Sequence, residues 1–195
     1  MKIAIIDYGA GNIQSILFAL KRLGVEGTLT ADAEEIKTAQ GVIFPGVGEA
    51  SSAMTKLRAT GLDQLIPTLQ QPVLGICLGM QLMCRSTAEG NTKGLGIFDV
   101  EVKQFSPALK VPQMGWNTIE KLKGPLFDHI PESSYMYLVH SYYAALASET
   151  VAQTDYGVAY SSALQKENFY GVQFHPEKSS QLGQQLLQNF LQLCE

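Results

Sequence analysis

The first half of the chain alternates short, continuous apolar runs with segments whose apolar residues recur every three or four positions. The runs at residues 3–6, 41–44 and 72–76 predict three buried strands, and the periodic segments between them predict helices. Strands that alternate with helices typically form a parallel sheet flanked by helices. The pattern therefore predicts an α/β fold with a central, mostly parallel sheet.

The helix expected after the first strand has recognisable ends. Asn12 can cap its first turn, and Gly24 can end it. Its apolar residues lie at the spacing of one buried helix face: Ile13, Ile16, Leu17, Leu20 and Leu23. Another helix is expected to begin with Met80 to Cys84, after the third strand.

The pattern changes after about residue 90. Apolar and charged residues alternate over 98–103, as they do in a strand with one exposed face. Ser179 or Ser180 can cap a closing helix. Further strands with short connections are expected at 135–143, 151–154, 158–164 and 170–174. We therefore expect an additional antiparallel portion in the second half of the chain.

Composition limits what the protein can be. With 195 residues and 46% hydrophobic residues, the chain fits one globular domain, residues 1–195. A formal net charge of -4, without a dense run of Lys or Arg, argues against nucleic acid as a partner. No apolar run approaches the roughly 20 residues of a membrane-spanning helix, so no membrane association is expected. Three cysteines without metal-type pairing predict no metal site and a reduced, cytoplasmic setting.

A candidate nucleophile follows the third predicted strand. In Gly75-Ile76-Cys77-Leu78-Gly79 a cysteine stands between two glycines, after an apolar strand and before a helical stretch. This is the G-x-nucleophile-x-G elbow with cysteine in place of serine, and its tight turn leaves no room for neighbouring side chains. A helix that begins just after Cys77 favours the thiolate over the thiol. Cys77 is therefore the predicted nucleophile.

The same turn supplies part of an oxyanion hole. The backbone N–H of Leu78, directly after the nucleophile, can stabilise a developing oxyanion. A second donor must come from another loop, and Val47 or Gly48, in the turn after the second strand, is the candidate. Cys84 and Cys194 are interpreted instead as buried structural cysteines at helical positions.

A cysteine nucleophile of this kind works with a histidine, and the chain has three. His175 follows an apolar strand, and Glu177 lies two residues further on. In an extended segment residues i and i+2 face the same side, and Pro176 between them stiffens that shape. His175 is therefore the predicted base and Glu177 the group that orients it. His140 lacks a carboxylate at such spacing and His129 resembles a surface turn, so both are interpreted as structural.

Two segments of the chain resemble the class I, or triad, glutamine amidotransferases: Gly75-Ile76-Cys77-Leu78-Gly79-Met80-Gln81 and Gly171-Val172-Gln173-Phe174-His175-Pro176-Glu177. Others are similar to the glutaminase subunits of imidazole glycerol phosphate synthases: Asp7-Tyr8-Gly9-Ala10-Gly11-Asn12, Pro45-Gly46-Val47-Gly48, Met114-Gly115-Trp116-Asn117, Val139-His140-Ser141-Tyr142-Tyr143 and His175-Pro176-Glu177-Lys178-Ser179. The resemblance runs from the first strand to the final helix. It implies a single flavodoxin-like domain of the amidotransferase type.

The resemblance also implies how glutamine would be bound and cleaved. Gln81 and Glu89 would recognise the substrate. The backbone from His140 through Ser141 to Tyr142 would contact its α-carboxylate. Cys77 would form a glutamyl thioester without any cofactor, and His175 would move protons.

A partner subunit is implied in the same way. Asn12, Trp116 and Lys178 would face a (β/α)8 cyclase, near the mouth of an ammonia passage. The peptide of Val47 would turn to complete the oxyanion hole when the partner binds its own substrate. The two subunits together would make imidazole glycerol phosphate and an aminoimidazole carboxamide ribotide, in histidine biosynthesis.

Two positions have simpler interpretations. Trp116 is alternatively a core aromatic, and Lys178 a solvated charge at a helix start. Gln113 departs from the family pattern, which more often has histidine there. That departure affects an interface detail and leaves the triad intact.

Other functions are alternatives to the glutaminase hypothesis. A sister amidotransferase, serving anthranilate, pyridoxal phosphate or purine synthesis, would keep the triad but should lack the segments at residues 7–12 and 114–117. A cysteine peptidase or a DJ-1-like hydrolase could share the elbow but would not need a His-Pro-Glu triplet. A non-catalytic nucleotide-binding module could use Gly9-Ala10-Gly11, but the G-x-G-x-x-G pattern fails at Gln14.

Overall fold

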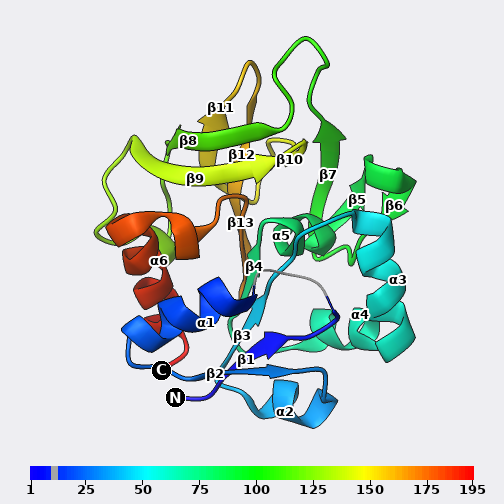
Figure 1. Ribbon diagram of the computed structural model, residues 1–195, viewed down its shortest axis with the longest axis vertical. Coiled ribbons are helices and arrows are strands. Elements are labelled where there is room, and N and C mark those ends of the chain that lie inside the picture. Colours follow the sequence, from blue (N-terminus) through cyan, green and yellow to red (C-terminus); the bar gives the residue numbers. More distant parts are fainter. Residues whose placement is uncertain (10–12) are drawn as a thin grey trace.

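The computed structural model describes residues 1–9 and 13–195, and its elements surround one large central sheet (Figure 1). The sheet contains β1 (Ile3–Ile6), β2 (Gly27–Thr30), β3 (Gly41–Phe44), β4 (Val73–Ile76), β5 (Cys84–Thr87), β6 (Thr92–Lys93), β7 (Phe98–Gln104), β10 (Tyr142–Ala144), β11 (Thr150–Asp155), β12 (Ala159–Lys166) and β13 (Phe169–Val172). A separate two-stranded ribbon consists of β8 (Gln113–Ile119) and β9 (Ser134–His140).

The helices lie around these strands. The α-helices are α1 (Ile13–Arg22), α2 (Ala33–Thr38), α3 (Ala50–Thr60), α4 (Leu62–Leu65), α5 (Leu78–Met83) and α6 (Ser180–Leu193). Short 3-10 turns are η1 (Ile66–Thr68), η2 (Glu89–Asn91), η3 (Pro125–Phe127) and η4 (Pro176–Lys178). No helix in the described ranges is long and apolar enough to cross a bilayer.

The strand order of the large sheet is β2–β1–β3–β4–β13–β12–β10–β7–β5–β6, with β11 paired to β12. From β2 to β13 all neighbours are parallel. Beyond β13 the pairs are antiparallel, apart from β5 with β7. The predicted parallel sheet with an antiparallel portion in the second half is confirmed.

The central parallel strands β1, β3, β4 and β13 are buried on both faces. On one face, Ile3 and Ile5 of β1 share a core with α1, α6 and the inner side of the β8–β9 ribbon. On the other face, Ala4 and Ile6 of the same strand pack in a core with α2, α3 and α5. Figure 1 shows this division, with α1 and α6 on one side of the strands and α3 on the other. A strand buried on both faces reads as a continuous apolar run, which is why β1 was predictable.

Several local predictions were wrong. Cys84 begins β5 and does not lie in a helix, because α5 ends at Met83. Ser179 does occupy the N-cap position of α6, but its side chain makes no capping hydrogen bond, and Ser180 is the first helical residue. The strands β2 and β8 were not predicted, since the first carries threonines on both sides of one leucine and the second is interrupted by polar residues. The predicted cap at Asn12 lies outside the described residues.

Candidate active site

The predicted elbow is present at the end of β4. Cys77 links β4 directly to α5 and has φ 54° and ψ -110°, a conformation that non-glycine residues adopt only under strain. Gly79 allows the turn to pack against the neighbouring strand, because a Cβ at this position would overlap the carbonyl oxygen of Phe44. The predicted nucleophile therefore lies in a tightly packed turn at the carboxyl end of the parallel strands.

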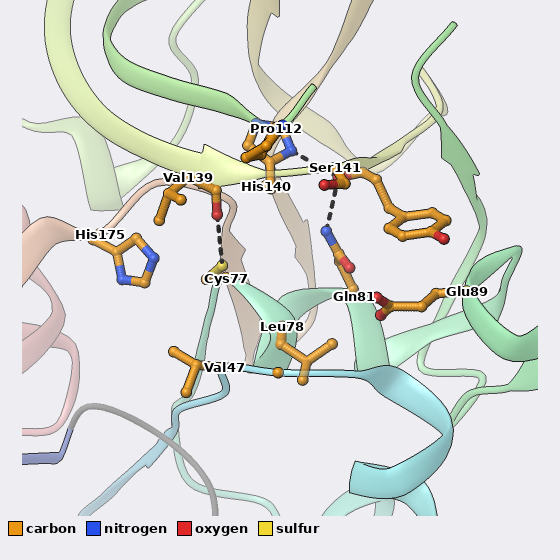
Figure 2. Close-up of a pocket in the computed structure, with 12 residues that line it drawn as sticks. Val47, Cys77, Leu78, Gln81, Glu89, Pro112, Val139, His140, Ser141 and His175 are labelled. Carbon is orange, nitrogen blue, oxygen red and sulfur yellow. Dashed lines mark hydrogen bonds between the residues drawn. The ribbon is translucent and has the colours of Figure 1, made fainter. Parts of the chain in front are cut away.

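Sheet register brings His175 to Cys77. Strand β13 lies beside β4 in parallel, with Val172 opposite Ile76, so the two chains leave the sheet at the same edge. Cys77 comes directly after β4, and His175 follows β13 by a few residues. Both side chains line one pocket, and Figure 2 shows the imidazole next to the sulfur. The predicted meeting of these two residues is confirmed.

Glu177 completes a buried triad. Its Oε1 accepts a 2.8 Å hydrogen bond from Nδ1 of His175, and the two side chains are 2% and 3% exposed. Because Nδ1 is bound to the carboxylate, Nε2 is left for chemistry, and it has no hydrogen-bond partner among the described residues. The backbone here differs from the extended shape we predicted, since Pro176–Lys178 forms the 3-10 turn η4.

The charge state of the histidine follows from its neighbours. Burial lowers the pKa of His175, but its interactions with Cys77 and Glu177 outweigh burial and raise the pKa to about 10. The contacts with Cys77 and Glu177 therefore favour the protonated imidazole. An imidazolium next to a cysteine favours the thiolate, which is the nucleophilic form.

Hydrogen bonds with Ser179 and with Tyr137 of the β8–β9 ribbon hold the backbone of His175 in place. The hydroxyl of Ser179 donates to the carbonyl oxygen of His175 at 2.7 Å and accepts from the backbone N–H of Tyr137 at 3.0 Å. The N–H of His175 donates to the carbonyl of Tyr137 at 2.9 Å. Ser179 thus supports His175, the predicted base, a role that sequence reasoning missed.

The pocket in front of Cys77 has a volume of about 290 Å³. It is lined by most of the predicted site residues: Val47, Cys77, Leu78, Gln81, Glu89, His140, Ser141, Tyr142 and His175. Figure 2 shows Gln81 and Glu89 on the side of the pocket away from His175. The structure therefore brings together the predicted nucleophile, oxyanion donors and substrate contacts.

Hydrogen bonds define what Gln81 and Glu89 can offer a ligand. The amide nitrogen of Gln81 donates to the carbonyl of Tyr142 at 2.9 Å and to Oε1 of Gln173 at 2.8 Å, so its oxygen is the side-chain atom left without a partner among the described residues. One oxygen of Glu89 accepts from the N–H of Ala50 at 2.9 Å. Burial raises the pKa of Glu89 despite that bond. Two acceptors, one of them a carboxylate, form a site suited to an ammonium group.

His140 is buried and neutral. Its Nδ1 donates to the carbonyl of Tyr142 at 2.7 Å, and its Nε2 lies 3.2 Å from the hydroxyl of Tyr160. Burial lowers the pKa of His140 to about 4. Tyr160 in turn donates to Oε1 of Gln113 at 2.9 Å. Gln113 is only 3% exposed, and its side chain contacts the pocket-lining His140 indirectly, through Tyr160.

The turn after β3 has an anchored start and an exposed end. The hydroxyl of Tyr8 donates to the carbonyl of Pro45 at 2.9 Å. Gly46 is pressed against the elbow, because a Cβ there would come within 2.8 Å of the backbone nitrogen of Gly79. Val47 is 42% exposed, whereas Leu78 begins α5 with an N–H that has no partner within the helix. Tyr8 was not predicted to support the site.

The outer face of the ribbon carries exposed apolar side chains. Met114 and Trp116 on β8 are 65% and 52% exposed, and they pair with Val139 and Tyr137 on β9. Trp116 is therefore not a core aromatic. Lys178 is exposed, with its Nζ 6.0 Å from the centre of the Tyr137 ring. The predicted partner residue Asn12 lies outside the described residues.

Comparison with known proteins gives a family. The model of the family described as "Glutamine amidotransferase class-I" matches residues 4–194. The chain belongs to the class I glutamine amidotransferases. This membership favours the glutaminase reading of the triad over a cysteine peptidase, a DJ-1-like hydrolase or a nucleotide-binding module.

Similar proteins indicate which kind of amidotransferase this chain resembles. The chain is 56% identical to the imidazole glycerol phosphate synthase subunit HisH of Bacteroides thetaiotaomicron, over 99% of this chain and 100% of that protein. It is 46% identical to the same subunit of Haemophilus influenzae, over 98% of each chain. A crystal structure of a glutamine amidotransferase has the same fold, with a TM-score of 0.77 and 18% identity over 98% of both chains.

Proposed function

We propose that this amidotransferase is the glutaminase subunit of an imidazole glycerol phosphate synthase, acting in histidine biosynthesis. The observation that carries the proposal is the buried Glu177–His175 pair beside the strained Cys77 in a substrate-sized pocket. The high identity with synthase subunits along the whole chain selects this synthase among the amidotransferases. Residues 1–195 act as one domain, without a cofactor, in the cytoplasm.

The reaction begins with attack by the Cys77 thiolate on the carboxamide carbon of glutamine. The carbonyl oxygen becomes an oxyanion, which the N–H groups of Leu78 and Val47 stabilise. His175 gives the proton of Nε2 to the leaving nitrogen, so ammonia departs and a γ-glutamyl thioester remains. Water then attacks the thioester and gives a proton back to His175, releasing glutamate and the thiolate. Glu177 keeps the imidazole oriented throughout.

Glutamine lies across the pocket with its charged end away from the sulfur. Its α-ammonium group donates to Glu89 and to the free oxygen of Gln81, the two acceptors described above. Its α-carboxylate meets the backbone from His140 through Ser141 to Tyr142. Substrates that lack the ammonium group would leave the half-buried carboxylate of Glu89 without a cationic partner, so they bind poorly.

The exposed face of the β8–β9 ribbon binds the cyclase subunit, a (β/α)8 barrel. An apolar patch of this kind on a protein surface marks an interaction site. Val139 both lines the pocket and pairs with Met114 of that face, so the distance from nucleophile to partner is short. Trp116, Lys178 and Asn12 contribute to the interface. Ammonia crosses it to the cyclase, which forms imidazole glycerol phosphate and aminoimidazole carboxamide ribotide.

Partner binding controls the oxyanion hole. The turn that contains Val47 is anchored at Pro45 through Tyr8 but exposed at its end, so its peptide can rotate without disturbing the elbow. Rotation on complex formation points the Val47 N–H at the oxyanion and limits glutamine hydrolysis in the free subunit.

A glutamine-derived diazoketone tests the proposal. Incubation followed by peptide mass mapping should label Cys77 and leave Cys84 and Cys194 unmodified, since both of these are buried away from the pocket. Excess glutamine should protect Cys77. An unlabelled Cys77 in folded protein would refute the glutaminase function. Hydrolysis that does not respond to an added cyclase and its ligand would refute the coupling.

A further inference from the structure

Gln173 is a fully buried polar residue next to the nucleophile. It follows β13 directly, is 0% exposed, and is held by a 2.9 Å bond from its backbone N–H to the carbonyl of Ser162. Its Nε2 lies 3.7 Å from Sγ of Cys77, within hydrogen-bonding distance of sulfur. The mechanism proposed above assigns no role to this side chain.

The orientation of the Gln173 amide is determined by its neighbours. The Tyr142 carbonyl can only accept, so the Gln81 atom that faces it must be nitrogen. The second hydrogen of that nitrogen points at Gln173, which must therefore present its oxygen there. If the Gln173 amide were reversed, its NH2 group would face the NH2 group of Gln81, and two donors cannot form a hydrogen bond. Its own nitrogen is thus left to face Cys77.

We infer that Gln173 donates a hydrogen bond to the Cys77 thiolate and so acts on the nucleophile directly. The thiolate then has two stabilising neighbours on the segment that follows β13, the imidazolium of His175 and the amide of Gln173. Hydrogen bonds to charged groups are stronger than those between neutral groups, and this one lies where water is excluded. Through Gln81, the same amide connects the nucleophile to the residues proposed to bind glutamine.

Two isosteric variants separate this role from a merely structural one. Gln173→Met removes the amide, whereas Gln173→Glu keeps an acceptor for Gln81 but places a carboxylate oxygen next to the sulfur. If Gln173 donates to the thiolate, the reactivity of Cys77 decreases from wild type to Gln173→Met to ionised Gln173→Glu. If Gln173 only holds Gln81 in place, Gln173→Glu behaves like wild type and Gln173→Met is the damaged variant.

The measurement is the rate of Cys77 alkylation by iodoacetamide as a function of pH. Iodoacetamide needs no bound glutamine, so the result stands even if the proposed glutaminase function fails. We expect Gln173→Met to slow alkylation at neutral pH by about 10-fold and to move the midpoint of the pH profile upward, as loss of one charge-assisted hydrogen bond implies. An unchanged profile would overturn the inference.

Ser162→Ala is the matched control. Ser162 is equally buried on the adjacent strand, and its hydroxyl has no partner among the described residues, so its removal should leave alkylation unchanged. Should both Gln173 variants fail to fold, the wild-type protein still gives an answer by NMR. The side-chain amide resonance of Gln173 should shift when Cys77 is alkylated, and a resonance that stays in place would contradict the contact.

Discussion

The imidazole of His175 donates to the carboxylate of Glu177 across a single proline, at 2.8 Å and with both side chains buried. A buried carboxylate this close stabilises the protonated imidazole and opposes the effect of burial on its pKa. The pair also decides which ring nitrogen faces Cys77. The contact with Glu177 therefore both orients the imidazole of His175 and favours its protonated form.

Replacing Glu177 with Gln should keep the shape and remove the charge. The pKa of His175 is then expected to fall below its present value of about 10, because the carboxylate no longer stabilises the cation. We expect kcat to fall by on the order of 10² to 10⁴, by analogy with orienting carboxylates in other triads. The alkaline side of the pH–rate profile should move to lower pH, since the imidazolium that protonates ammonia is lost earlier.

This prediction is checked by the pH dependence of kcat and by NMR titration of His175. Glu167→Gln, at an exposed turn between β12 and β13, is the control and should leave both unchanged. A His175 titration curve that is identical in Glu177→Gln and wild type would contradict the argument.

Cys77→Ala should abolish glutaminase turnover, with a decrease of about 10⁴-fold or more, while the protein stays folded. The side chain contributes little to stability because it lies at the pocket. Cys194→Ala, at the end of α6, is the control for loss of a buried thiol and should keep turnover. Steady-state assays and circular dichroism provide the comparison, and near-normal turnover in Cys77→Ala would exclude it as the nucleophile.

The sequence predicted the triad because its two motifs are local. The elbow at Cys77 and the triplet that ends at Glu177 can each be recognised within a few residues, although the triplet leads into the 3-10 turn η4 and not into the predicted extended segment. What could not be predicted depends on pairing between distant segments. Nothing in the local sequence around Gln113 indicates its partner, and only the fold brings its side chain to the hydroxyl of Tyr160.

Contacts between distant segments also explain why some local predictions were wrong or missed an element. Strand β2 has little apolar character of its own and is set by its parallel pairing with β1. Ser179 resembles a helix cap, but its hydroxyl is taken by His175 and Tyr137, which lie on other elements. Cys84 follows a helical pattern, yet it pairs with Phe98 as the first residue of a strand. In each case tertiary contacts override the local signal.

Gly79→Ala should destabilise the protein and damage the site together. The added Cβ would overlap the carbonyl oxygen of Phe44, which forces the elbow away from β3. Overpacking of this kind costs about 1–3 kcal/mol in the free energy of unfolding. We also expect slower alkylation of Cys77. Gly24→Ala is the control: it has a positive φ but open space, so it should cost about 1 kcal/mol and leave Cys77 reactivity unchanged. Urea denaturation and iodoacetamide kinetics distinguish the two variants.

His140 should make the protein less stable in mild acid. Its pKa is lowered to about 4 by burial, so between pH 6.5 and 4 the unfolded chain binds a proton that the folded chain does not. Stability from this group is therefore complete above pH 6.5 and is lost as pH falls towards 4, by up to about 3 kcal/mol. His140→Asn keeps a donor for the Tyr142 carbonyl and removes the titration, so its stability should depend less steeply on pH across this range.

The comparison uses urea denaturation at several pH values. His129→Asn removes an exposed imidazole instead and should show the slope of the wild type. Equal slopes in wild type and His140→Asn would mean that the buried imidazole does not contribute to acid sensitivity.

Trp116→Ala should weaken binding to the cyclase subunit. Trp116 is 52% exposed and stands edge-on to Tyr137, at a ring-centre distance of 6.0 Å, on the apolar face of the ribbon. Central aromatic anchors of interfaces commonly contribute about 2 kcal/mol or more, so we expect the Kd to rise by about 30-fold. Leu29→Ala, on β2 far from the ribbon, removes another exposed apolar side chain and should not change the Kd (Figure 1). Calorimetric titration with purified cyclase measures both, and alkylation of Cys77 should be normal in each variant. If Trp116→Ala binds the cyclase as tightly as Leu29→Ala does, the partner must occupy a different face, and ammonia would need another exit from the pocket.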